Sequence, residues 1–145
     1  MVDSEQFKKA TTLVIDNLEG GYYNPKWHNT KDFRYGSSGE TMFGIDRING
    51  GTINTSEAGK KFWGIIDANK TPAVWKWNYN GGALASQLKD LAGQMMQPTY
   101  ETFAKSFMSP QLRETVEKDP RLLFHFIYAV WNGSGWFLKF SKDME

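Results

Sequence analysis

The chain of 145 residues contains no cysteine, which excludes a disulfide framework, a thiolate metal site and a cysteine nucleophile. Its only histidines, His28 and His125, are far apart and lack carboxylates at metal-ligand spacing, so we expect no metal and no other cofactor. A Gly-x-Ser-x-Gly elbow and a phosphate-binding glycine-rich loop are also missing. These absences exclude thiol, serine-triad and nucleotide-dependent chemistry.

An excess of either charge is also absent, because 17 basic and 16 acidic residues leave a net charge of +1. Charge therefore favours neither nucleic acid nor an anionic membrane as a partner. The longest apolar run, residues 122–131, is about half of what a bilayer span requires. The N-terminus lacks the basic start and apolar stretch of a secretory signal. We expect a single domain over residues 1–145, without stable membrane insertion, a transmembrane segment or a signal peptide.

Helical periodicity covers much of the chain. The first predicted helix begins near Asp3, which with Gln6 resembles a capping box. Its apolar face is predicted to hold the residues at helical spacing: Phe7, Ala10, Thr11, Val14 and Leu18. The following Gly20-Gly21 pair accepts positive φ without steric cost, which is a common way for a helix to end. Glu19 is therefore expected in the last turn.

Helical patterns return from Ser56 to residue 69 and again from residue 84. The stripe of Leu84, Leu88, Leu91 and Met95 predicts a helix that Pro98 ends, with a separate short helix over residues 100–107. Further helices are expected after two pairs of a capping residue and a proline, Ser109-Pro110 and Asp119-Pro120, and around Trp136. The helix from Pro120 is apolar on nearly all sides, so we predict that it is central and that His125 is a satisfied core residue.

Residues 22–55 are instead rich in Gly, Asn, Thr and Ser. Two short runs resemble strands, residues 31–35 and 41–45, and turns are expected at residues 36–39 and 49–51. Trp75 and Trp77 alternate as in a short extended stretch. The predicted fold class is α+β, mainly helical, with a small β-hairpin or irregular lobe.

Glu19 is a candidate general acid. The negative end of the helix dipole and partial burial beside Tyr22, Tyr23 and Trp27 both favour the protonated carboxyl. The alternative is a solvated Glu at a helix end. A carboxylate followed by a polar lobe and a helical remainder is the arrangement of an enzyme that binds an extended polymer in a cleft.

Hydrolysis of a glycosidic bond usually requires a second group, which stabilises the oxocarbenium-like centre or positions water. The lobe offers Asp32, Glu40 and Asp46. The segment that contains Glu40 is favoured, because Thr41 supplies a hydroxyl that could hold water and Gly44 permits close approach of a ligand. The alternative is that Glu40 lies in solvent on a turn.

Glu19-Gly20-Gly21-Tyr22, followed by the run from Gly39 to Ile45, resembles the glycoside hydrolase family 108 type of phage endolysin, in the lysozyme-like superfamily. The EGGY signature of that family implies that Glu19 is the essential residue of an N-acetylmuramidase. Thr41, Gly44 and Ile45 match its Thr-x-x-Gly-Ile pattern, and residues 128–135 resemble a late-helix pattern that includes Asn132. The chain departs from the family in residues 24–35, where a compact Asp-Pro-Gly-Gly type of turn is expected.

The resemblance implies a lysozyme-like fold with a substrate cleft between lobes and cleavage of the bond between N-acetylmuramic acid and N-acetylglucosamine in a peptidoglycan strand. The predicted catalytic residues are Glu19, Glu40 and Thr41, and the predicted substrate-binding residues are Tyr22, Trp27, Asp32, Gly44 and Asn132. We expect a monomer that is made in the host cytoplasm and reaches the periplasm with a holin or similar partner. The alternatives are a lytic transglycosylase and a catalytically silent peptidoglycan-binding or virion structural protein.

Overall fold

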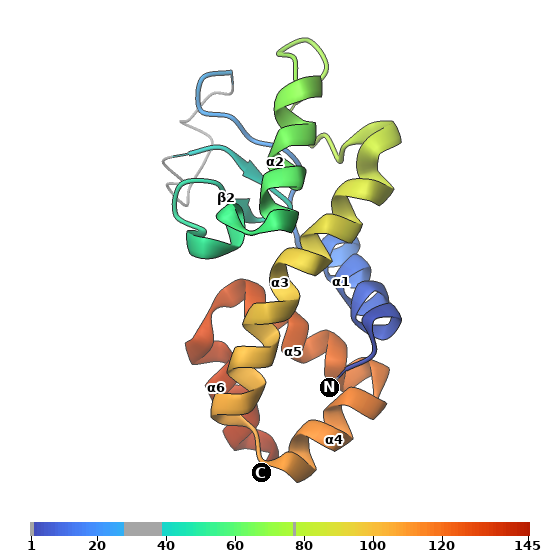
Figure 1. Ribbon diagram of the computed structural model, residues 1–145, viewed down its shortest axis with the longest axis vertical. Coiled ribbons are helices and arrows are strands. Elements are labelled where there is room, and N and C mark those ends of the chain that lie inside the picture. Colours follow the sequence, from blue (N-terminus) through green and yellow to red (C-terminus); the bar gives the residue numbers. More distant parts are fainter. Residues whose placement is uncertain (1, 28–38, 77) are drawn as a thin grey trace. The chain divides into compact units, whose positions relative to one another are not determined.

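The computed structural model describes residues 2–27, 39–76 and 78–145 (Figure 1). Most of these residues are helical, and a two-stranded antiparallel sheet accompanies the helices, so the mainly helical α+β class is confirmed. The elements in chain order are α1 (Ser4–Leu18), β1 (Thr41–Met42), β2 (Ile45–Asp46), the 3₁₀ helix η2 (Gly51–Thr55), α2 (Glu57–Asn69), the 3₁₀ helix η3 (Gly82–Leu84), α3 (Ala85–Phe107), α4 (Pro110–Lys118), α5 (Pro120–Asn132) and α6 (Ser134–Met144).

The chain forms two compact units. The helical unit comprises Met1–Asn17 and Gly93–Glu145, and the mixed unit comprises Leu18–Ala92. The assignment of residues 1–145 to a single domain stays a prediction. None of the helices in the described ranges combines the length and the apolar character that crossing a bilayer demands.

An aromatic cluster forms the core of the helical unit. Phe137 of α6 is fully buried, and its ring centroid lies 5.0 Å from that of Phe126 on α5 and 6.0 Å from that of Tyr100 on α3. Tyr100 also contacts Phe7 of α1, with 5.5 Å between ring centroids. Buried rings at such distances contribute both apolar area and edge-to-face attraction. The cluster therefore joins α1, α3, α5 and α6 without any cysteine.

The first helix forms as predicted but ends differently. Phe7, Ala10, Thr11 and Val14 are buried as expected, whereas Leu18 is 45% exposed and Ile15 is buried instead. The helix ends at Leu18, so Glu19 follows the last turn rather than lying in it. The prediction that Gly20-Gly21 ends the helix through positive φ is wrong, because neither glycine has a positive φ.

Pro98 does not end a helix, which corrects the prediction of two separate helices. The helix α3 runs without a break for 23 residues, and Pro98 lies inside it. A proline there removes the hydrogen bond to the carbonyl of Gln94 and costs about 3 kcal/mol relative to alanine. Buried side chains on both sides of it, including Met95 and Tyr100, offset this cost.

Capping side chains start three helices where the sequence predicts them. Ser56 accepts a hydrogen bond from the backbone N–H of Gly59, Ser109 accepts one from Leu112, and Asp119 accepts from Arg121 and Leu122. The helix α5 is less enclosed than expected, because His125 is exposed rather than a core residue. Its buried face consists of Leu123, Phe126, Ile127, Ala129 and Val130.

The strand-like run at residues 41–45 is a complete hairpin rather than one strand. Thr41 pairs with Asp46 and Met42 with Ile45. The two-residue turn places Phe43 at φ 54° and Gly44 at φ 75°, and positive φ at both positions is the pattern of a type I′ hairpin turn. Tyr23 adds a bridge to Thr41, so the chain after Glu19 lies against the hairpin.

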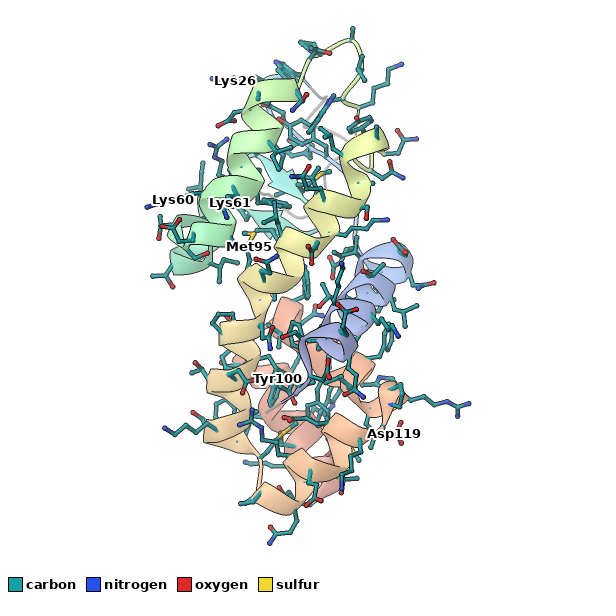
Figure 2. All side chains as sticks on the ribbon, turned by 45° about the vertical axis from the view of Figure 1, so that its right-hand side comes forward. Lys26, Lys60, Lys61, Met95, Tyr100 and Asp119 are labelled. Atoms are coloured by element: carbon teal, nitrogen blue, oxygen red, sulfur yellow. The ribbon has the colours of Figure 1, made fainter. Side chains whose placement is uncertain are left out.

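The hairpin packs on α2, as Figure 1 shows for β2. Phe43 of the turn lies 6.2 Å from Phe62 of α2 between ring centroids, and both rings are buried. The opposite face of α2 carries exposed lysines, of which Figure 2 labels Lys60 and Lys61. The helix is therefore amphipathic, and its apolar face fixes the hairpin.

The segment after α2 begins with a turn over residues 72–74, and the predicted extended stretch at Trp75 and Trp77 stays a prediction. The N–H of Trp75 donates to the carbonyl of Thr71 at 2.9 Å, and the Trp75 ring is buried. Trp77 lies outside the described residues, as do residues 28–38. The predicted strand at residues 31–35 and most of the predicted turn at residues 36–39 therefore fall outside the described chain.

Candidate active site

Glu19 directly follows α1 and is half-buried. Within the described ranges, no hydrogen bond or ion pair engages its carboxylate. Burial, which removes water from the charged form, raises the pKa of this carboxyl from 4.5 to about 7. A carboxyl group with this pKa holds its proton in a substantial fraction of molecules at neutral pH, as a general acid must.

Tyr22 fixes the chain that follows Glu19. Its N–H donates to the carbonyl of Tyr79 at 2.8 Å, and its ring meets that of Trp75 edge-on at 4.9 Å between centroids. The ring is fully buried, so it offers no surface to a ligand in this conformation. Its hydroxyl donates to Oε2 of Glu40 and accepts from the side-chain amide of Asn24 at 3.0 Å.

Glu40 is surrounded by donors rather than by solvent. Nη1 of Arg47 donates to its Oε1 at 2.8 Å, and Nζ of Lys70 donates to its Oε2 at 2.9 Å. The Glu40 side chain is only 11% exposed. Both carboxylate oxygens are therefore held, Oε1 by Arg47 and Oε2 by Lys70 and Tyr22.

Asp67 of α2 completes a group of alternating charges. Its two oxygens accept from Nη1 and Nη2 of Arg47, each at 2.7 Å, and Nζ of Lys70 lies 2.9 Å from its Oδ1. The Arg47 guanidinium also lies 5.0 Å from the centroid of the Trp63 ring, within the range of a cation–π contact. Two cations and two carboxylates thus form a compensated cluster, here called the Glu40 cluster: Glu40, Arg47, Asp67 and Lys70.

The cluster keeps its carboxylates ionised. Burial alone would raise the pKa of Glu40, but hydrogen bonds from Tyr22, Lys70 and Arg47 outweigh it and hold the pKa below its usual value. The hydrogen bonds from Arg47 lower the pKa of Asp67 to about 2. Burial, followed by the hydrogen bond to Glu40, raises the pKa of the Tyr22 phenol, so Tyr22 stays a donor. Glu19 and Glu40 therefore differ in protonation at neutral pH. The Glu40 carboxyl is ionised, whereas a substantial fraction of the Glu19 carboxyl holds its proton.

The other predicted site residues of the mixed unit are spread around the hairpin. Thr41 is partly exposed at the start of β1, where its backbone pairs with Tyr23 at 2.9 Å in both directions. Gly44 is exposed in the hairpin turn. Trp27 is partly exposed, and its ring centroid lies 6.0 Å from that of Tyr22. Trp27 is thus a side chain beside Tyr22 with ring surface left for a ligand.

Two other predicted residues do not join this group, and a third, Asp32, lies outside the described residues. Asp46, an alternative second carboxylate, accepts hydrogen bonds from the backbone N–H groups of Ile48 and Asn49, each at 2.9 Å, and so stabilises its own turn. Asn132 belongs to the helical unit, where it is exposed at the end of α5 and donates to the carbonyl of Tyr128 at 2.9 Å.

Sequence reasoning missed the partners of Glu40. Arg47 and Lys70 are 7 and 30 positions away along the chain. Arg47 directly follows the hairpin, so its position opposite Glu40 could have been predicted from the turn at Phe43-Gly44. Lys70 has no such local signal, because only the packing of α2 brings it to Glu40.

Within the described ranges, no group of three His, Asp or Glu side chains is arranged to hold a metal ion. Comparison of the chain with protein-family models, curated proteins and solved structures found no match. The geometry of Glu19 and of the Glu40 cluster is therefore the basis on which a function is assigned.

Proposed function

We propose that this chain is a peptidoglycan hydrolase, an N-acetylmuramidase of lysozyme-like fold in which Glu19 is the general acid. The observation that carries this proposal is the state of Glu19, a half-buried carboxyl with a pKa near 7 and no cation paired with it among the described residues. The resemblance of residues 19–22 and 39–45 to family 108 endolysins supports the substrate class.

In this reaction Glu19 transfers its proton to the glycosidic oxygen as the bond to the anomeric carbon breaks. A water molecule adds to that carbon and gives up a proton, and Glu19 is protonated again from solvent. Thr41, with a partly exposed position beside Tyr23, is the proposed holder of this water, and Trp27 is the proposed stacking surface for a sugar ring. Asp32, Gly44 and Asn132 stay proposed contacts of the glycan.

The test is release of reducing sugar from purified peptidoglycan by the Glu19→Gln variant, which keeps the shape of the side chain and removes the acid. We expect a loss of at least about a hundredfold, the scale of a positioned general acid. Glu57→Gln, at an exposed carboxylate in the first turn of α2, is the matched control and should retain the parent rate. An unchanged rate in Glu19→Gln would refute the assignment.

A lytic transglycosylase is a second candidate, and the state of Glu40 favours it. In such an enzyme the sugar's own 6-hydroxyl attacks the anomeric carbon, so no carboxylate is needed to activate water. Both oxygens of Glu40 accept hydrogen bonds, which leaves this carboxylate little capacity as a base. Mass spectrometry separates the two reactions, because the 1,6-anhydro product is lighter by one water than the hydrolysis product.

The same proposal includes the compartment in which the protein is made and the partner that gives it access to peptidoglycan. A monomer made in the host cytoplasm would need a holin or similar partner to reach the peptidoglycan strand. A catalytically silent wall-binding or virion structural protein is the remaining alternative. Sedimentation with peptidoglycan without release of soluble fragments over time would support that alternative over the enzyme.

A further inference from the structure

Tyr22, a buried side chain, connects the segment of Glu19 with the Glu40 cluster. Tyr22 lies three residues after Glu19, and its phenol donates to Glu40 Oε2. The two residues between them are glycines, and a Cβ added to Gly20 would meet nothing within 4 Å. Because side-chain packing at Gly20 cannot hold this stretch, the place of Glu19 depends on where α1 ends and on where Tyr22 is fixed.

We propose that Tyr22 and Glu40 act together as a positioning pair, whose hydrogen bond holds the Glu19-Gly20-Gly21-Tyr22 segment in the geometry that proton donation requires. This inference rests on the proposed role of Glu19 as general acid. It gives Glu40 a positioning role in place of the catalytic role that the sequence suggests. Tyr22 likewise acts through Glu19 and not through contact with a sugar.

The contacts of Glu40 suit a fixed anchor. The groups that face it are Tyr22 from the Glu19 segment, Arg47 after β2, and Lys70 at the end of α2, with Asp67 of α2 behind both cations. The Glu40 carboxylate, with three hydrogen-bond donors and an 11% exposed side chain, is held on both of its oxygens. If Glu40 acted as a nucleophile or base, its carboxylate would have to break these hydrogen bonds in each turnover.

The contacts of Tyr22 show how that anchor fixes the segment. Its main chain is tied to the carbonyl of Tyr79, and the next residue, Tyr23, is bridged to Thr41. These bonds hold the backbone, while the phenol bond to Glu40 holds the ring, which contacts Trp27 and Trp75. Loss of the phenol bond would free the ring to shift, and the Glu19 segment with it.

The decisive experiment compares Tyr22→Phe, Glu40→Gln and the double variant by kcat, KM and pH profile on purified peptidoglycan. Each single variant should lower kcat by about tenfold, because a small misplacement of a catalytic group has effects of this order, and should leave KM within about twofold. The double variant should lose about as much as the more impaired single variant, and not the roughly hundredfold product, because both changes weaken the same Tyr22–Glu40 hydrogen bond. The alkaline limb of each pH profile should move to lower pH as water reaches the Glu19 carboxyl.

Tyr100→Phe is the matched control. Tyr100 is also fully buried, and its phenol donates at 2.9 Å to the ion-paired Glu117, but in the helical unit (Figure 2). It should lower the thermal midpoint about as much as Tyr22→Phe while leaving the pH profile of activity unchanged.

Three results would overturn the positioning pair: unchanged activity in Tyr22→Phe, a hundredfold loss in the double variant, or loss in Glu40→Gln as complete as in Glu19→Gln. Tyr22→Phe keeps every ion pair of the Glu40 cluster, so it decides the matter even if Glu40→Gln does not fold. Parent activity in Glu19→Gln would instead refute the proposed function itself.

Discussion

Replacing Glu19 by Gln should stabilise the protein above pH 7 and leave its stability unchanged below about pH 4. Burial raises the pKa of this carboxyl from 4.5 to about 7. The folded protein therefore holds the proton more tightly than the unfolded chain, and this contribution to stability is complete below pH 4.5 and lost as pH rises through 7. Glutamine has no proton to lose in this pH range, so the stability of the Glu19→Gln variant lacks this dependence on pH.

The magnitude follows from the two pKa values. At about 1.4 kcal/mol per pKa unit, the rise from 4.5 to about 7 corresponds to about 3.5 kcal/mol, which partial exposure to solvent reduces to about 2–3 kcal/mol. A chain of 145 residues has an unfolding entropy of about 0.3 kcal/mol per kelvin. The variant should therefore melt about 7–10 °C above the parent at pH 9.

The assay is thermal and urea unfolding of both proteins between pH 4 and pH 9, followed by circular dichroism. The stability difference should be near zero at pH 4, should grow between pH 5 and pH 7, and should level off above pH 8. Glu57→Gln, at an exposed site, is the control. A difference between Glu19→Gln and the parent that does not change with pH would refute the buried-carboxyl argument.

Substitutions at two further positions, Thr11 and Pro98, test the helical unit. Thr11 is fully buried, and its hydroxyl has no hydrogen-bond partner among the described residues, so Thr11→Val should raise the free energy of unfolding by about 1–2 kcal/mol. Thr11→Ser keeps the hydroxyl but removes the methyl group that faces Gly93, so it should lower the free energy of unfolding. A serine variant more stable in urea than the valine variant would contradict this. Pro98→Ala restores a donor for the Gln94 carbonyl inside α3. It should raise the free energy of unfolding by about 1–2 kcal/mol, a value that already allows for the greater freedom of the unfolded chain with alanine. A loss of stability would mean that α3 requires the proline.

The helix starts and the hairpin region show what local chemistry could predict. Ser109 and Asp119 cap helices as expected, because a capping side chain bonds to backbone only two or three residues away. The prediction for residues 41–45 had the correct β tendency but missed the turn at Phe43, since a non-glycine residue at positive φ is uncommon.

The errors lie where distant packing outweighs a local preference. Pro98 normally ends a helix, yet the buried residues on both sides of it keep α3 continuous. Leu18 and Ile15 are both apolar, and only the direction in which α1 packs decides that Ile15 is buried and Leu18 is not. His125 was expected in the core because its neighbours are apolar, but it occupies the exposed side of α5.

The candidate site also has one part that local sequence predicts and another that tertiary packing decides. The sequence alone identified Glu19, because a carboxylate between a helix and two glycines is visible in one short stretch. Two partners of Glu40, Tyr22 and Lys70, could come only from the tertiary structure, since they lie 18 and 30 positions away along the chain, whereas Arg47 lies 7 positions away across the hairpin. Local sequence determines which groups can titrate, whereas burial and charge partners, which determine whether they do so at neutral pH, arise only in the folded structure.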